Sequence, residues 1–170
     1  MLSLLLLRHA KSSWDDPALA DFDRPLARRG EEAALRMGAY MAAQELAPDL
    51  ILCSTAKRAR QTLEIVLRRL GADLPTRFAD GLYLATPAAL LACLGKGGGG
   101  QRVMIVGHNP GMHRLAVTLA QRGDGKSLRA LAAKFPTAAL AVLTFEAPGW
   151  SKIAQGGGRL ALFMTPKRLP

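Results

Sequence analysis

Short apolar runs, each closed by polar residues, limit what this chain can fold into more than any other feature of its sequence. The first run spans residues 2–7 and contains the leucines from Leu4 to Leu7, directly before Arg8 and His9. Runs of roughly four to eight apolar residues that end this way are typical of strands buried on both faces of a sheet. Further runs of this kind occupy residues 50–53, 103–106, 139–145 and 160–164. The chain is therefore expected to build a sheet that helices cover on both sides.

Segments with helical periodicity alternate with these runs. The predicted helices span residues 28–46, 56–70, 87–94 and 110–121. In the first of them, Ala34, Met37 and Met41 fall three and four positions apart and form an apolar stripe. The last is expected to have Asn109 as its N-cap and Pro110 as its first residue. The alternation predicts an α/β fold, a three-layer sandwich with helices on both sides of a mainly parallel sheet.

The last two predicted strands have a different connection. Residues 146–159 between them contain Pro148, Gly149 and the glycines from Gly156 to Gly158, and this stretch is too short for a helical crossover. We therefore expect an antiparallel pair of strands at the C-terminus. With 170 residues and 49% hydrophobic content, the chain can bury one core, and residues 1–170 are expected to form a single domain.

The chain carries a strong positive charge. Its 23 Lys and Arg residues against 13 Asp and Glu residues give a formal net charge of +10 at pH 7. Such a charge favours an anionic partner such as phosphate, an acidic protein surface or nucleic acid. Nucleic-acid binders usually combine basic residues with stacking aromatic ones. Because aromatic residues make up only 5% of this chain and its arginines are scattered, no nucleic-acid partner is expected.

The N-terminal leucines also resemble the apolar part of an export signal, but their context argues against that interpretation. A signal peptide needs a positive start and an apolar stretch of roughly 7 to 15 residues, whereas Leu4 to Leu7 follow no Lys or Arg and lead directly into charged residues. No segment reaches the ~18 apolar residues of a membrane span. Cys53 and Cys93 lie far apart without metal-ligand spacing. We therefore expect a cytoplasmic protein without a membrane partner.

Polar clusters follow three of the predicted strands at the point where each strand ends. Arg8 and His9 follow the first, residues 54–58 follow the second, and residues 107–110 follow the third. Because the carboxyl ends of parallel strands meet at one edge of a sheet, these clusters should bring histidines and arginines into one pocket beside helix N-termini. Such a pocket favours an anion.

Histidine and arginine side chains in one pocket suit phosphoryl transfer. A neutral imidazole is a competent nucleophile towards phosphorus, and the phosphohistidine that forms is labile enough to be hydrolysed in a second step. Guanidinium groups and a second imidazole can bind the negative charge on the transferred group. This scheme requires neither a metal nor another cofactor.

The polar clusters also belong to four motifs that resemble a known family. They are LLLRHAKSSW (5–14), DRPL (23–26) followed by Gly30, CSTAKRARQT (53–62) and VGHNP (106–110). In this order they are similar to the histidine phosphatase superfamily, and within it to the SixA-like phosphohistidine phosphatases. The resemblance spans residues 2–165 and implies a phosphoglycerate-mutase-like fold. It further implies that His9 is the nucleophile and that Arg8, Arg58 and His108 form the phosphate pocket.

Two positions depart from the family pattern. Ala10 stands where the signature has glycine, and we expect it to be tolerated if its φ stays negative. Larger relatives that resemble phosphoglycerate mutase use a carboxylic acid as proton donor, and only Asp80 lies near that position. Asp80 is equally suited to an ordinary turn, since Gly81 follows it. An imidazole leaving group departs more easily than an alkoxide, so the lack of a clear acid favours phosphohistidine as substrate.

Three functions are compatible with these residues. The first is a metal-independent phosphatase that acts on protein phosphohistidine. The second keeps the mechanism but acts on a small phosphomonoester, and the third is a catalytically silent phosphate-binding module. Each motif also has a structural interpretation: His9 as a hydrogen-bonded side chain at a strand end, His108 as a turn residue, and residues 21–30 as a salt-bridged loop. The complete set of Arg8, His9, Arg58 and His108 favours an enzyme.

Overall fold

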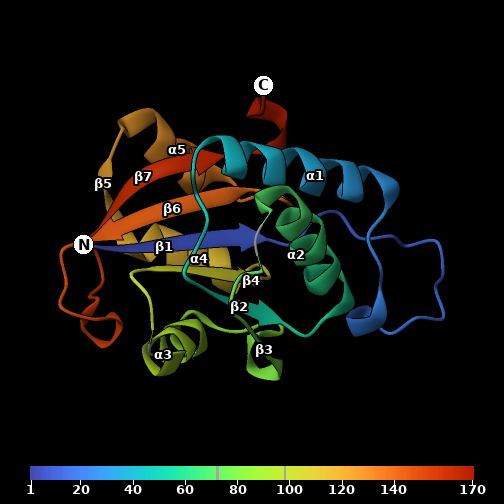
Figure 1. Ribbon diagram of the computed structural model, residues 1–170, viewed down its shortest axis with the longest axis horizontal. Helices are drawn as coiled ribbons and strands as arrows, with labels where there is room; N and C mark the ends of the chain where they lie inside the picture. The colour runs from blue at the N-terminus through green and yellow to red at the C-terminus, as the bar shows by residue number, and fades with distance from the viewer. Residues whose placement is uncertain (72, 98) are drawn as a thin grey trace.

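The computed structural model describes residues 1–71, 73–97 and 99–170, and the strands in these ranges form one seven-stranded sheet with the order β3-β2-β4-β1-β6-β7-β5. The strands are β1 (Leu2–Arg8), β2 (Leu50–Ser54), β3 (Thr76–Ala79), β4 (Arg102–Gly107), β5 (Ala120–Gly123), β6 (Leu140–Phe145) and β7 (Gly158–Met164). The five apolar runs correspond to β1, β2, β4, β6 and β7, and β1 lies in the middle of the sheet (Figure 1).

The sheet is mainly parallel. β1, β2, β3 and β4 run in one direction, and β5 pairs in parallel with β7. β6 runs antiparallel to both β1 and β7, which confirms the predicted antiparallel pair at the C-terminus. Because β6 is reversed, its first residue, Leu140, lies opposite Leu7 on one side and Met164 on the other. The segments before β6 and after β7 therefore lie at the edge where β1 ends.

Helices cover both faces of the sheet. They are α1 (Arg28–Ala43), α2 (Lys57–Leu70), α3 (Pro87–Gly97), α4 (Gly111–Leu119) and α5 (Gly125–Ala133). In Figure 1, α1 and α2 lie in front of the sheet and α4 lies behind it. No helix within the described ranges is long and apolar enough to cross a bilayer. The three-layer α/β sandwich predicted from the sequence is confirmed.

The leucines of β1 supply both halves of the core. Leu5 and Leu7 pack with side chains of α1 and α2, including Met37. Leu4 and Leu6 pack on the opposite face with side chains of α3, α4 and α5. All four leucines are fully buried, as the alternation of side chains along a strand requires when both faces of a sheet are covered.

Several short elements were not predicted. β3 and β5 are four-residue strands at the two edges of the sheet, and because their side chains are largely exposed they form no apolar run. The nine-residue helix α5 has Leu131 as its buried residue, and Leu128 packs partly buried against the same core. Three η helices (3-10) also occur near the strand ends, namely η1 (Asp21–Asp23), η2 (Asp80–Leu82) and η4 (Pro166–Arg168), and a fourth, η3 (Trp150–Lys152), lies before β7.

Several predicted helix boundaries were wrong. The helix predicted over residues 87–94 runs on to Gly97, and the helix predicted over residues 110–121 ends at Leu119, directly before β5 begins. The helix predicted to begin at Pro110 begins at Gly111, with Pro110 in the N-cap position. Asn109 does not cap it, because its Nδ2 donates a hydrogen bond to the carbonyl oxygen of Phe135 at 2.9 Å. The first long helix ends at Ala43, before the predicted limit of residue 46.

Candidate active site

The carboxyl ends of β1, β2 and β4 bring the four predicted site residues together. Arg8 is the last residue of β1, and His9 follows it with its backbone N–H donating to the carbonyl oxygen of Gly107, the last residue of β4, at 3.0 Å. Arg58 lies in the first turn of α2, directly after β2. The ring centroids of His9 and His108 are 5.1 Å apart. We call the group of Arg8, His9, Arg58 and His108 the phosphate pocket.

His9 is held as a neutral imidazole with one nitrogen available. Its Nδ1 lies 2.7 Å from the carbonyl oxygen of Ala10, and because a carbonyl oxygen only accepts hydrogen bonds, Nδ1 carries the proton in the neutral ring. Burial is the main reason why the pKa of His9 falls to about 3, and the positive charges of Arg58 and Arg8 add to the shift. Nε2 therefore keeps its lone pair at neutral pH, and Arg58 Nε lies 3.4 Å from it.

His108 is also buried and neutral. Its Nε2 lies 2.7 Å from Ser54 Oγ, so the last residue of β2 fixes the ring. Burial is the main reason why the pKa of His108 falls to about 4, and Arg58 adds to the shift. Its Nδ1 is buried and has no hydrogen-bond partner within the described residues. This nitrogen is suited to contact an oxygen of a phosphoryl group.

Arg8 is anchored by the segment that precedes β6. Its Nη1 donates to the carbonyl oxygen of Phe135 at 2.9 Å, and the N–H of Ala138 donates to the carbonyl oxygens of Arg8 and His9 at 3.2 and 3.1 Å. Burial lowers the pKa of Arg8, and repulsion from Arg58 lowers it further. Arg8 Nε is a buried donor without a partner in the described parts of the chain, which suits an anion between the two guanidinium groups.

Asp21 is a residue of the site that the sequence analysis missed. Its backbone oxygen accepts a hydrogen bond from Arg58 Nη1 at 2.6 Å, and its carboxylate accepts one from Arg58 Nη2 at 3.0 Å. The Tyr83 hydroxyl donates to the same carboxylate, and Arg24 Nη1 pairs with its other oxygen at 3.1 Å. The pKa of Asp21 falls to about 2, mainly because of the hydrogen bond from Tyr83 and further because of Arg58. Asp21 is therefore ionised at neutral pH and holds Arg58 in place.

The interpretation of residues 21–30 as a salt-bridged loop is correct but incomplete. Arg24 is buried, and it donates to Ser12 Oγ and to the Ser13 carbonyl oxygen as well as to Asp21. These bonds tie the segment after His9 to η1. No sequence pattern distinguishes Asp21 from Asp23 in this segment, because the pairing partner Arg58 lies far away along the chain.

Ala10 and Gly30 show how the backbone around His9 is packed. Ala10 is fully buried and does not have a positive φ, and its N–H donates to Thr62 Oγ1 at 2.9 Å, so the alanine fits without backbone strain. Gly30 lies in the first turn of α1 against the residue that follows Ala10. A Cβ at Gly30 would lie 2.1 Å from the Lys11 carbonyl oxygen, so this close approach requires glycine.

Asp80 lies outside the phosphate pocket. It is exposed at the start of η2, and its Oδ1 accepts a hydrogen bond of 2.6 Å from Thr55 Oγ1. Thr55 directly follows β2, so the carboxylate lies near the carboxyl edge of the sheet. A role of Asp80 as proton donor remains a prediction, and of the two carboxylates in this region it is Asp21 that contacts Arg58.

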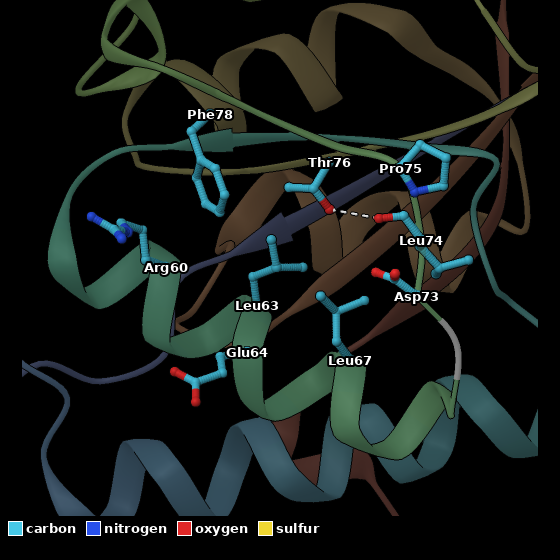
Figure 2. Close-up of a pocket in the computed structure, with 9 residues that line it drawn as sticks. All are labelled: Arg60, Leu63, Glu64, Leu67, Asp73, Leu74, Pro75, Thr76 and Phe78. Atoms are coloured by element: carbon cyan, nitrogen blue, oxygen red, sulfur yellow. Dashed lines mark hydrogen bonds between the residues drawn. The ribbon is translucent and has the colours of Figure 1, made fainter.

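A cleft of about 610 Å³ between α2 and β3 is separate from this chemistry. Figure 2 shows Leu63 and Leu67 of α2 on one side and Phe78 and Thr76 on the other. None of the four residues of the phosphate pocket lines this cleft, and no histidine does.

The α/β sandwich, with Arg8 and His9 at the end of its central strand, has the architecture of the phosphoglycerate-mutase-like class. Residues 4–83 match the model of the histidine phosphatase superfamily, branch 1. An uncharacterised protein from Mycobacterium tuberculosis is 38% identical over 164 residues, which cover 95% of this chain and 100% of the relative.

Solved structures agree with this assignment. A candidate phosphohistidine phosphatase SixA from Agrobacterium tumefaciens is 34% identical, with a TM-score of 0.80 over 97% of this chain and 98% of its own. The protein histidine phosphatase SixA complexed with tungstate has the same fold, with a TM-score of 0.75 at 24% identity over 99% of this chain and 100% of its own. The chain belongs to the histidine phosphatase superfamily and is a SixA-like phosphatase.

Proposed function

We propose that the protein hydrolyses phosphoryl groups in two steps through a covalent phosphohistidine on His9, without a metal ion. The observation that carries this proposal is the hydrogen bond of 2.7 Å between His9 Nδ1 and the Ala10 carbonyl oxygen. It fixes the tautomer in which Nε2 has a lone pair directed towards Arg58. The low pKa of His9, about 3, keeps this lone pair free of a proton over the physiological range.

The two steps balance without a further reactant besides water. In the first, His9 Nε2 forms a bond to phosphorus, the bond from phosphorus to the leaving group breaks, and the leaving group takes up a proton. In the second, a water oxygen bonds to phosphorus, the P–Nε2 bond breaks, and inorganic phosphate leaves while the proton of the water goes to solvent. Arg8, Arg58 and His108 would bind the charged oxygens in both steps.

We further propose protein phosphohistidine as the substrate. Asp21, the carboxylate that contacts the pocket, has a pKa of about 2 and therefore has no proton to give at neutral pH. An imidazole leaving group tolerates this better than an alkoxide, because it can take its proton from solvent. The relative from Agrobacterium tumefaciens is described as a candidate enzyme of the same specificity. The free thiols of Cys53 and Cys93 support a cytoplasmic location.

A small phosphomonoester is the second candidate substrate. The position of Asp80 beside Thr55, near the carboxyl end of β2, supports it, since a carboxylic acid at this edge could protonate an alkoxide. Rates with a phosphohistidine-bearing protein, several sugar phosphates and an aryl phosphate, measured side by side with wild type and Asp80→Asn, separate the two. A preference for sugar phosphates that is lost in Asp80→Asn would overturn the phosphohistidine proposal.

The mechanism is tested with variants of the pocket. His9→Ala is expected to abolish hydrolysis, and Arg58→Ala to lower kcat by about 10²–10³, as is typical when one donor to a developing oxyanion is lost. Alkaline quenching of wild type during turnover preserves the acid-labile P–N bond, and mass spectrometry under non-acidic conditions should then find one added phosphoryl group on His9. Folded His9→Ala protein that keeps full activity would rule out the covalent step, and loss of wild-type activity with a chelator would rule out metal independence. A folded wild type inactive on every substrate class would point to a silent module.

A further inference from the structure

A second basic site lies beside the phosphate pocket. It is a cavity of about 450 Å³, a size within the usual range of small-molecule sites. Basic side chains and threonine hydroxyls dominate its polar lining, and no Asp or Glu lines it. The basic and threonine residues that line it are Lys11, Arg29, Lys134, Lys167, Thr137 and Thr165. We call this group the basic cavity.

The cations of the basic cavity form no ion pair within the described residues. In the described ranges, Asp21 pairs with Arg24 and Arg58, Glu32 with Arg28, and Glu64 with Arg68. None of these ion pairs includes a cation of the basic cavity. Like charges held close together repel one another, and a bound anion removes that repulsion.

The topology of the sheet explains why four cations from distant segments meet there. Lys11 follows the end of β1, and Arg29 lies in the first turn of α1. The segments that carry Lys134 and Lys167 flank the reversed strand pair, since the start of β6 lies opposite the end of β7. All four cations thus lie at the edge where the phosphate pocket is built, yet the basic cavity contains none of the pocket's residues.

One segment separates the two sites. Lys134, Pro136 and Thr137 line the basic cavity. On the other side of the same segment, the Phe135 carbonyl oxygen accepts from Arg8 and the Ala138 N–H donates to the backbone beside His9. An anion in the basic cavity would therefore contact the segment that anchors Arg8, without entering the phosphate pocket.

We propose that the basic cavity binds a polyphosphate chain, that is, an anion with two or more linked phosphate groups. Lysine ammonium groups and threonine hydroxyls are typical phosphate ligands, and four cations match the three to four negative charges of such a chain. The cavity has no aromatic side chain that could stack on a base, so the phosphate chain supplies the recognition. Free polyphosphate and the phosphate chain of a nucleotide share this chemistry.

Calorimetric titration of the whole protein tests the proposal, with tripolyphosphate, ATP and orthophosphate as probes at fixed ionic strength. The variant Lys134→Glu/Lys167→Glu reverses two charges of the basic cavity, and both lysines are exposed. Its matched control is Lys126→Glu/Lys152→Glu, which makes the same change in net charge at exposed lysines away from the cavity. Arg58→Ala, or His108→Ala if the former does not fold, removes the phosphate pocket as a competing site.

Wild type is expected to bind one tripolyphosphate more tightly than orthophosphate. The cavity variant should lose at least about tenfold in affinity, because attraction becomes like-charge repulsion, while the control and the Arg58→Ala protein should stay within about threefold. ATP that binds like tripolyphosphate supports recognition of the chain alone, and tighter binding of ATP supports a nucleotide. Equal losses in the cavity variant and its control, a loss confined to Arg58→Ala, or no binding by folded wild type would overturn the proposal.

Discussion

At the scale of single residues, the state of His9 depends on its backbone neighbour and on its burial. The carbonyl oxygen of Ala10 selects the tautomer, and burial keeps the ring neutral. His108 is neutral for the same reason, with Ser54 as its partner. Two buried histidines that resist protonation make the stability of the protein depend on pH.

The first prediction concerns that dependence. The pKa values of His9 and His108 in the folded state are about 3 and about 4, below the value of about 6.5 expected in the unfolded state. Between these limits the unfolded chain binds more protons, so the free energy of unfolding falls as the pH decreases below 6.5. We expect a loss of roughly 1–2 kcal/mol for each histidine between pH 7.5 and 5.

Urea denaturation at pH 7.5 and 5.0 measures this loss. His9→Asn should show a smaller difference between the two pH values than wild type, because one of the two titrating groups is gone. His113→Asn is the control, since His113 lies in α4, outside the phosphate pocket. A wild-type protein equally stable at both pH values would contradict the prediction.

The second prediction concerns Asp21 as a positioning residue. Asp21→Ala removes the carboxylate that holds Arg58 Nη2 and is expected to lower kcat/KM by about tenfold through misplacement of the guanidinium group. The backbone bond from Arg58 Nη1 to the Asp21 carbonyl oxygen would remain. Asp21→Asn should restore part of the loss, because an amide oxygen also accepts hydrogen bonds.

Steady-state kinetics with one phosphorylated substrate check this role, together with Tyr83→Phe, which leaves the carboxylate but removes its hydroxyl donor. We expect the order wild type, Tyr83→Phe, Asp21→Asn, Asp21→Ala in decreasing kcat/KM. A faster Asp21→Ala enzyme would instead mean that the carboxylate competes with phosphate for Arg58.

At the scale of elements, the contact between α1 and the loop after β1 fixes the nucleophile's surroundings. The Ala27 N–H donates to the Lys11 carbonyl oxygen at 2.9 Å, and Gly30 approaches the same oxygen. The loop that follows β1 is thus held by its contacts with the start of α1, and we call these contacts the clamp.

The third prediction tests this contact. Gly30→Ala would place a Cβ within 2.1 Å of the Lys11 carbonyl oxygen, so α1 or the loop must shift. We expect a loss of about 1–3 kcal/mol in the free energy of unfolding, the range typical of overpacking, together with reduced activity. Gly81→Ala is the matched control, because its Cβ would meet no atom within 4 Å. Chemical denaturation that finds both variants equal to wild type would show that the clamp is not needed.

At the scale of the whole molecule, the helices on both faces pack against the same sheet. β1 contributes leucines to the cores on both faces, so neither layer of helices has a core independent of this strand. We propose on this ground that residues 1–170 form one domain. Such an arrangement favours a single cooperative transition over separate unfolding of two parts.

The fourth prediction follows from this shared strand. Trp150 is buried in the core on the side of α3, whereas Trp14 is 71% exposed beside Arg24, near the site. Urea transitions followed by the fluorescence of Trp14→Phe and Trp150→Phe variants should each coincide with the transition of helical structure seen by far-UV circular dichroism. A separate transition reported by either tryptophan would contradict a single cooperative unit.

The sequence by itself determined five of the seven strands in the described ranges and which polar residues follow them. A fully apolar run such as Leu4 to Leu7 is buried in almost any fold, and Arg8 and His9 directly follow it, so local pattern was enough to predict both. The edge strands β3 and β5 escaped prediction, because exposed four-residue strands have no apolar pattern and form only where a neighbouring strand pairs with them.

Only the tertiary structure decided what surrounds the phosphate pocket. Asp21 contacts Arg58 and Tyr83, which lie 37 and 62 positions further along the chain. No local sequence pattern contains information about contacts over such separations. The basic cavity arises in the same way, because the reversal of β6 brings Lys134 and Lys167 to the edge where Lys11 lies. Interactions between segments far apart in the chain exist only once the sheet has fixed their positions, and those interactions set the protonation, orientation and net charge of the site.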